Sequence, residues 1–422
     1  MSPYRFAPLL CLALAPACDD LQLCGDSDGD GSCDAYDTCP YHPAAPDTGP
    51  IVRGTVTCVS PDGTTSDTRP LTSFPIHTQL GEGVTDCTGT FTLPVDDAAT
   101  LSDGPVEVGF AYQGDVHGPA GSVTELRVMD DLHEAWGTGA FHFGFSQTVQ
   151  GTVATEDGRT VLQLDPLLID TSECEIWRVG TEVVEDYQEV RRIAMPGGKL
   201  EFMRRAGVFG TSPYAFYSYV DLASNFLDLR PERARRERTL FHESAHVVRD
   251  LDDGDASHWD GDNVNYRYAR CHRGTEIFEE PYAFHEGWAD YWAQARRNGR
   301  AHLTGPTTVT SRCDSEAGPV GLALTPDHVD WVEHLLADRL LDLADCVGEG
   351  DPDLGDRRML QALEDNRGLV HSLFEFESAL CADRECCGLD RAEPPAKCPP
   401  DYHDDGLSCS GPDGHVIRHY RG

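Results

Sequence analysis

The stretch "ERTLFHESAHVVRD" (residues 237–250) decides how the second half of the chain is expected to fold. Its uncharged positions recur at helical spacing, and residues four apart lie on one face of a helix. His242 and His246 therefore point the same way and can bind one metal ion. Glu243 follows the first histidine directly, where its carboxylate can reach a water molecule on that ion. The stretch predicts a buried helix with a metal-binding face.

The His-Glu-x-x-His spacing is that of zinc metallopeptidases, in which both histidines bind zinc and the glutamate is a general base. Zinc lowers the pKa of its water to about 7, so Glu243 would take a proton as this zinc-activated water attacks a polarised carbonyl. The alternative is an ordinary amphipathic helix that carries two histidines by chance. Uncharged residues at Leu240, Ser244, Ala245 and Val247 favour the metal site, because charges buried beneath a metal ion are costly.

A catalytic zinc site needs a third protein ligand. One class of zinc peptidase adds a glycine and a histidine three and six residues after the second histidine, but Arg249 and Asp252 occupy these positions and exclude that class. The stretch "AFHEGWADYWAQARR" (residues 283–297) has a helical apolar face and carries Glu286 and Asp290 four residues apart. This second helix can supply the missing ligand.

Together, the two motifs resemble the thermolysin-like gluzincins, whose pattern is H-E-x-x-H followed by E-x-x-x-D. The resemblance covers residues 239–296 and implies that His242, His246 and Glu286 are the zinc ligands. It also implies that Asp290 hydrogen-bonds His242 and fixes its tautomer. The interval between the motifs is longer than in thermolysin, so the resemblance is to the clan and not to a close family.

The resemblance further implies a Tyr or His that stabilises the oxyanion formed on the attacked carbonyl. The candidates lie between the two motifs and on a downstream helix: His258, Tyr266, Tyr268, His272, His328 and His334. We name Tyr268 and His328 as the predicted donors, with ordinary structural roles as the alternative. The segment after the first motif also carries Asp252, Asp253, Asp255, Asp260 and Asp262. These residues predict either a calcium site or a solvated acidic loop.

The N-terminal residues 1–17 have the pattern of a signal peptide, with Arg5 before the apolar run "FAPLLCLALA". The sequence "LAPAC" resembles a bacterial lipobox, so Cys18 is expected to carry lipid; the alternatives are ordinary cleavage with free secretion and a buried N-terminal helix. A total of 16 cysteines is typical of an oxidising compartment. We expect export to the bacterial cell envelope or outer surface.

Residues 18–50 combine an acidic segment with a proline-rich linker. The pattern D-x-D-x-D-G-x-x-D-x-x-D-x-C-P resembles one unit of a thrombospondin type 3 repeat, and alternating Asp and Gly let a short backbone wrap round calcium. The resemblance implies five calcium ligands: Asp26, Asp28, Asp30, Asp34 and Asp37. The alternative is a solvated acidic linker.

The remaining chain predicts a multidomain fold. Residues 51–170 alternate Val, Thr and Gly as strands do and resemble a transthyretin-like β-sandwich, within which Cys58 and Cys87 could form a disulfide. Residues 171–380 predict an α+β zincin-type catalytic domain: a helix over "CEIWRVGTEVVEDYQEV", strands over "GKLEFM" and "PYAFYSYVDL", and then the helices of the two motifs. Residues 381–422 predict a small disulfide-rich cap.

The net charge of −39 argues against nucleic acid and anionic lipid as partners, and leaves a lipid anchor as the expected link to a membrane. The expected function is that of an exported zinc metallopeptidase that hydrolyses bonds of a peptide or protein substrate. The alternative is a cell-surface, calcium-dependent binding or adhesion protein in which the zinc site is structural or vestigial.

Overall fold

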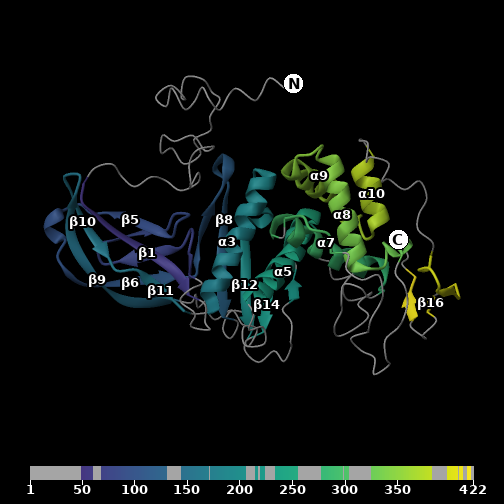
Figure 1. Cartoon of the computed structure of the whole chain (residues 1–422), viewed down its shortest axis with the longest axis horizontal. Coiled ribbons are helices and arrows are strands. Elements are labelled where there is room, and N and C mark those ends of the chain that lie inside the picture. Colours follow the sequence, from purple (N-terminus) through teal and green to yellow (C-terminus); the bar gives the residue numbers. More distant parts are fainter. Residues whose placement is uncertain are drawn as a thin grey trace, which may run out of the picture. The chain divides into compact units, whose positions relative to one another are not determined.

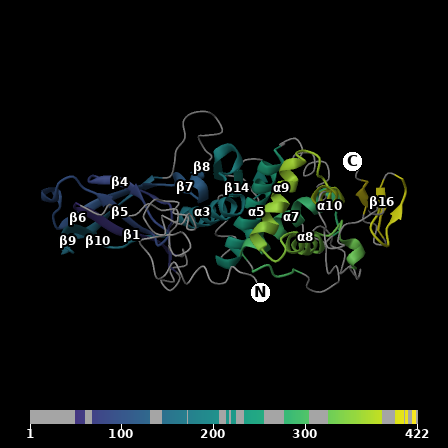
Figure 2. The same cartoon turned by 90° about the horizontal axis from the view of Figure 1, so that it is seen from above.

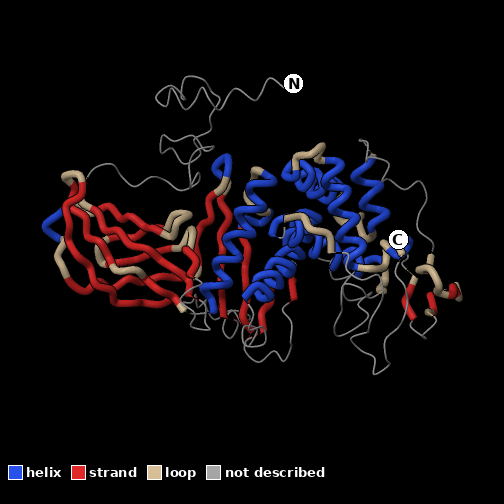
Figure 3. The backbone as a smooth tube through the Cα atoms, in the orientation of Figure 1, coloured by secondary structure: helices blue, strands red, loops and turns tan. Residues whose placement is uncertain are grey.

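The computed structural model describes residues 49–59, 68–130, 144–170, 172–205, 214–216, 219–223, 233–254, 277–297, 299–303, 325–382, 397–406, 408–411 and 416–419. The contacts within the chain divide it into two compact units. Unit 1 comprises Met1–Gln188 and Arg192–Ala194, and unit 2 comprises Glu189–Arg191 and Met195–Gly422. Unit 1 carries most of the strands, and unit 2 carries most of the helices (Figure 3).

Unit 1 is built on one curled, mixed sheet (Figure 1). Its strands follow the order β11-β1-β10-β9-β6-β3-β4, and β2 and β5 also pair with β1. Strand β1 runs parallel to β10 and β11, and the other described pairs are antiparallel. The strands are β1 (Ile51–Val59), β2 (Thr68–Pro70), β3 (Pro75–Thr78), β4 (Gly81–Val84), β5 (Thr90–Pro94), β6 (Gly104–Ala111), β9 (Gly144–Glu156), β10 (Arg159–Leu164) and β11 (Leu167–Ile169).

The alternation in the sequence sets the buried face of this sheet, because successive side chains of a strand point to opposite faces. Short 3-10 turns, η3 (Ala98–Thr100) and η4 (Pro119–Gly121), lie between strands, and a further hairpin joins β7 (Gln113–His117) to β8 (Val123–Asp130). The expected β-rich region is confirmed in this form.

Helix α3 (Ser172–Arg191) follows the strands, as its apolar spacing predicted. The indole of Trp177 packs edge-on against Phe74, with ring centroids 5.4 Å apart, and donates a hydrogen bond to the carbonyl oxygen of Thr72. A disulfide joins Cys58 on β1 to Cys174 on α3. The predicted Cys58–Cys87 bridge is therefore wrong: the sequence grouped the two cysteines within one domain, but the fold brings the start of α3 to β1.

Unit 2 begins with the 3-10 turn η5 (Pro196–Gly198) and three strands, of which β12 runs parallel to β14 and β13 antiparallel to it. The strands are β12 (Lys199–Arg205), β13 (Tyr214–Phe216) and β14 (Tyr219–Ala223). The first lies where the sequence predicted it, but the single strand predicted over residues 213–222 is two antiparallel strands. The main helices pack together (Figures 1 and 2): α5 (Arg233–Asp253), α7 (Glu280–Arg297), α8 (Glu333–Val347), α9 (Pro352–Asp365) and α10 (Leu373–Cys381). Helices α5, α7 and α8 carry the candidate site.

A glycine allows α7 and α8 to approach closely. A Cβ atom added to Gly287 would lie 2.7 Å from Cδ2 of Leu336 and 3.0 Å from the carbonyl oxygen of Glu333. Both distances are shorter than ordinary van der Waals contacts, and the second involves backbone that cannot rotate away. Gly287 therefore sets the distance between the two helices next to Glu286.

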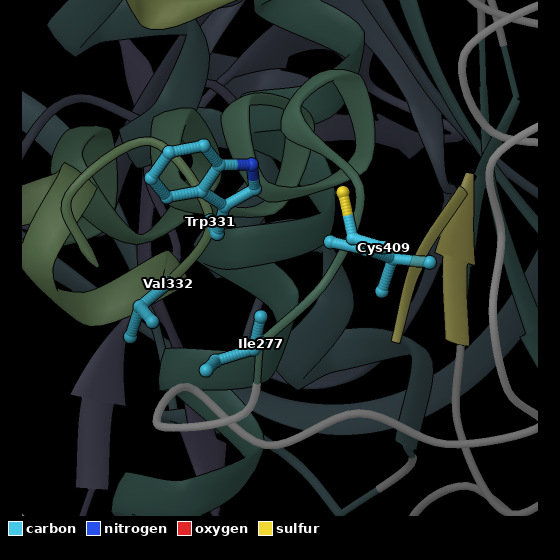
Figure 4. Close-up of a cluster of buried hydrophobic side chains, with 5 residues drawn as sticks. Ile277, Trp331, Val332 and Cys409 are labelled. Atoms are coloured by element: carbon cyan, nitrogen blue, oxygen red, sulfur yellow. The ribbon is translucent and has the colours of Figure 1, made fainter. Parts of the chain in front are cut away.

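The C-terminal cap is a three-stranded sheet of β15 (His403–Asp404), β16 (Ser408–Ser410) and β17 (Val416–Arg418). The disulfide Cys398–Cys409 holds it, so a disulfide-held element is confirmed here. Its Cys409 and Ile417 are buried with three residues of the helical part, Ile277, Trp331 and Val332 (Figure 4). Ile277 and Val332 form an isolated antiparallel bridge, which joins the chain just before α7 to the chain just before α8.

Among the helices that the structure describes, none is both long enough and apolar enough to cross a membrane. The predicted signal peptide, Cys18 and the five predicted calcium ligands (Asp26, Asp28, Asp30, Asp34 and Asp37) lie outside the described residues. These assignments stay predictions.

Candidate metal centre

Helix α5 places the first motif in the interior of unit 2. Five of its apolar residues are fully or almost fully buried: Leu240, Phe241, Ala245, Val247 and Val248. Burial of this stripe turns the opposite side of the motif, with His242 and His246, toward α7. The guanidinium of Arg297 on α7 lies 4.5 Å above the ring of Phe241, a further contact between the two helices.

Helix α7 brings Glu286 to both histidines. The Oε2 atom of Glu286 lies 3.2 Å from Nε2 of His242 and 3.4 Å from Nε2 of His246. The ligand atoms of the three residues all lie within 4.8 Å of one another. The convergence expected from the two motifs is present.

The spacing of these atoms fits a tetrahedral zinc ion. With bonds of about 2.0–2.1 Å, two ligand atoms of a tetrahedral site lie about 3.3–3.4 Å apart. The two distances from Glu286 Oε2, 3.2 Å and 3.4 Å, agree with that edge length. Two imidazoles and one carboxylate are also the ligands of catalytic zinc sites that keep one position open. The residues present therefore fit zinc.

Asp290 orients the first histidine. Its Oδ1 atom lies 3.0 Å from Nδ1 of His242, so the imidazole donates from Nδ1 and leaves Nε2 to face Glu286. On its other side, Asp290 Oδ2 lies 3.3 Å from Nε2 of His334 on α8, and Arg238 lies 3.7 Å from Oδ1. The sequence suggested His334 only as an oxyanion donor, whereas the structure places it on the carboxylate that orients His242.

These contacts shift the pKa values of His242, Asp290 and His334. Burial alone would lower the pKa of His242, but hydrogen bonds with Asp290 and Glu286 outweigh burial and raise it well above its ordinary value. Burial would raise the pKa of Asp290, but the two histidines hold it well below its usual range. Burial would likewise lower the pKa of His334, but its hydrogen bond with Asp290 outweighs burial and raises it above the ordinary value. Asp290 is thus an anion between two imidazoles.

The second histidine has different surroundings. Burial lowers the pKa of His246, and this outweighs the attraction of Glu286. Its ring stacks on that of His285, with centroids 4.1 Å apart and an angle of 18° between the planes. Burial also lowers the pKa of His285 well below its ordinary value, and the charge of Arg249 adds to this shift. Both imidazoles are therefore neutral near pH 7, as zinc coordination by His246 requires.

Glu243 lies beside the first ligand and is 9 % exposed. Its charge contributes to the raised pKa of His242, which places the carboxylate within electrostatic range of that ring. A general base must lie within hydrogen-bond reach of the proton that it takes, and Glu243 is a candidate because it is mostly buried and follows His242 directly on α5.

Of the other predicted residues, some have contacts that the structure describes and the rest lie outside the described residues. His328, at the end of the 3-10 turn η6 (Pro326–His328), is buried and its Nδ1 accepts a hydrogen bond from the backbone nitrogen of Thr325. Tyr268 lies outside the described residues, so both donor assignments stay predictions. Asp252 and Asp253 do not belong to an exposed acidic loop: both are buried at the end of α5, where Asp252 faces Arg191.

No protein-family model matches the chain, and no curated protein matches it. Function is therefore inferred from the residues of the site.

Proposed function

We propose that this protein is a zinc metallopeptidase, related to the thermolysin-like gluzincins, that hydrolyses peptide bonds in an exported compartment. The observation that carries the proposal is the convergence of His242, His246 and Glu286, whose ligand atoms all lie within 4.8 Å. Asp290 hydrogen-bonds the first of these residues, His242, and Glu243 follows His242 directly on α5 and is mostly buried. This combination suits hydrolysis better than a metal site that only holds the fold together.

A zinc ion, when bound by these three side chains, supplies Lewis-acid polarisation of the substrate carbonyl and of water. Glu243 accepts the proton of the attacking water and then delivers it to the departing amine, so that one carboxylate acts first as base and then as acid. Asp290 accepts a hydrogen bond from Nδ1–H of His242 and keeps the ring in one orientation and one tautomer. Burial of the first motif keeps the surroundings of Glu243 low in water, which strengthens each electrostatic contact.

The chemistry of the described cysteines argues against the alternative of a structural zinc site. Structural sites are closed by four protein ligands, often cysteines. The cysteines in the described part of the chain are disulfide-bonded: Cys58, Cys87, Cys174, Cys346, Cys381, Cys398 and Cys409. None of these seven can provide a thiolate.

The proposal also includes the domain types, the calcium binding and the export that the sequence predicts. They are the transthyretin-like sandwich for residues 51–170, the zincin-type catalytic domain for residues 171–380, calcium binding by residues 18–50 and export with lipid on Cys18. A display segment and a sandwich before a peptidase domain would hold the enzyme at the bacterial surface.

The test is to purify the protein, measure its zinc content and assay cleavage of a denatured-protein or peptide library. We expect about one zinc per chain and cleavage that is lost in Glu243→Gln but kept in a matched exposed variant, Glu349→Gln. Zinc without cleavage by the unchanged protein would favour the surface-binding alternative. No zinc after purification in zinc-containing buffer would overturn the site itself.

A further inference from the structure

Resting on the proposed zinc site, we infer that Arg249 and His285 form a positioning pair that holds His246 in place for the metal. Neither residue belongs to the zinc-binding pattern. Arg249 stands three residues beyond His246 on α5, and His285 precedes Glu286 on α7. The pair thus joins the two helices that supply the ligands.

In the described part of the structure, His246 lacks the second hydrogen bond that usually fixes a zinc-binding histidine. A zinc-binding histidine almost always donates its other ring N–H to a carboxylate, a carbonyl or water, which fixes the ring. His242 follows this rule through Asp290, whereas Nδ1 of His246 is buried and has no hydrogen-bond partner among the described residues. Something other than a hydrogen bond must therefore prevent rotation of the His246 ring.

The ring of His246 stacks on the ring of His285. His285 lies almost parallel to His246, with an angle of 18° and a centroid distance of 4.1 Å, and it is only 1 % exposed. By contrast, His242 meets His246 edge-on at 88° and 5.0 Å. Rotation of the His246 ring about its Cβ–Cγ bond would drive its edge into the face of His285. The stack therefore restricts the same motion that a hydrogen bond at Nδ1 would restrict.

Arg249 holds His285 in place. Nη1 of Arg249 lies 2.8 Å from Nδ1 of His285, and since a guanidinium only donates, the imidazole accepts there. Arg249 also donates to the carbonyl oxygen of Val370 and lies 4.7 Å above the ring of Phe284. A side chain that is 2 % exposed and held on several sides is rigid, so His285 has a fixed backing.

This arrangement gives Arg249 a role at the position where another zinc-peptidase class has glycine. A glycine there could not reach His285. Because α5 completes about one turn between His246 and Arg249, both side chains lie on the face that meets α7. One helix thus supplies the ligand and the cation, and the other supplies the ring between them.

The test compares His285→Ala with the double variant His285→Phe/Arg249→Met, which restores a flat ring without leaving a buried cation unpaired. Zinc affinity is measured by competition with a chromophoric chelator, and site geometry by the absorption spectrum of the cobalt(II)-substituted protein. We expect His285→Ala to weaken zinc binding about 10- to 100-fold and to change the cobalt spectrum. The double variant is expected to recover most of both properties.

Arg358→Met is the matched control, since Arg358 bonds the exposed Glu349 in the same unit and lies outside the site. It is expected to leave zinc affinity and the cobalt spectrum unchanged. If His285→Ala does not fold, Arg249→Lys is measured instead, with an expected loss of several-fold in affinity. Affinity within twofold of the unchanged protein, together with an unchanged spectrum, would overturn the positioning role in either variant.

Failure of this inference can be distinguished from failure of the proposed function. If the unchanged protein binds no zinc, the proposed function fails and the positioning role fails with it. If the unchanged protein binds zinc and cleaves substrate while His285→Ala behaves like it, only the positioning role is wrong. A further readout is the kinetic split: misplacement of one ligand should lower kcat while KM changes little.

Discussion

The carboxylate of Asp290 lies between two imidazoles, with Oδ1 3.0 Å from Nδ1 of His242 and Oδ2 3.3 Å from Nε2 of His334. One buried anion therefore connects the candidate metal-binding face of α5 to the start of α8. The pKa of Asp290 is held well below its usual range because both histidines outweigh the effect of burial. Asp290 is thus an anion near neutral pH, beside the candidate metal ligand His242.

Replacing this charge should weaken the metal site. In Asp290→Asn, the amide keeps the shape of the side chain but no longer provides an anion for His242. We expect zinc affinity to fall about 10- to 100-fold, measured by chelator competition. Asp342→Asn is the control, because that carboxylate is half exposed and its described partner is His302. Equal affinities in the two variants would contradict the orienting role.

Loss of Glu286, the proposed third ligand, should weaken zinc binding more severely. In Glu286→Gln, the neutral amide faces both histidines at the distances that the carboxylate now spans. We expect metal analysis after dialysis to find little zinc on this variant. Zinc content equal to that of the unchanged protein would show that Glu286 is not a ligand.

Zinc binding should depend on pH through His242. Its pKa is raised well above the ordinary value in the metal-free protein, and a histidine must lose its proton before it binds metal. Zinc affinity should therefore fall steadily as the pH is lowered through that raised pKa. Chelator competition between pH 5.5 and 9 measures the slope. In Asp290→Asn the slope should move to lower pH, because a main cause of the raised pKa is removed.

The same shift has a consequence for the stability of the metal-free protein. A group whose pKa is higher in the folded than in the unfolded state binds protons more tightly when folded. The contribution of His242 is therefore fully present below its unfolded pKa of about 6.5 and is lost as the pH rises through the folded pKa. The free energy of unfolding by urea, compared with that of His242→Gln, should show a difference that declines from pH 6 to alkaline pH.

A methyl group at Gly287 should separate α7 from α8. Alanine favours a helix over glycine by about 1 kcal/mol, but the added Cβ would lie 3.0 Å from a backbone oxygen of α8 and 2.7 Å from Leu336. Overpacking of this kind costs about 1–3 kcal/mol, so the clash should outweigh the helix propensity. We expect a net loss of stability and a longer His334–Asp290 distance. An unchanged melting temperature would contradict this account.

Removing the cap disulfide should loosen the cap. Cys398 and Cys409 are 11 residues apart, and closing a loop of that size is worth about 3 kcal/mol in the chain-entropy model. In a variant with serine at both positions, hydrogen exchange should accelerate in β15, β16 and β17 and change little in α5. Equal protection of the cap in both proteins would show that its packing alone suffices.

The motif helices could be predicted from the sequence because their spacing is local. His242 and His246 lie one turn apart on a single helix, so the spacing alone places them on one face, and the same holds for Glu286 and Asp290. The stack of His285 on His246 could not be predicted, since it depends on the distance and rotation between α5 and α7. No local rule identified Gly287, which controls a helix contact.

Long-range pairings show the same limit. The sequence grouped Cys58 with Cys87 because both fall in one strand-rich segment, whereas the disulfide joins Cys58 to Cys174 across 116 residues. Asp252 and Asp253 followed a pattern typical of exposed acidic loops, but α5 continues through Asp253 and buries both. In each case, the deciding contact lies far away in the chain.

The cluster that the cap completes around Trp331 also sets an order of assembly. Ile277 and Val332 are synthesised well before Cys409 and Ile417, yet all four are buried together. During synthesis, the junction before α7 and α8 therefore stays uncovered on one side until Cys409 and Ile417 have left the ribosome. The candidate ligands precede the cap in the chain, so the cap residues close a surface of a helical unit whose metal-binding candidates have already been made.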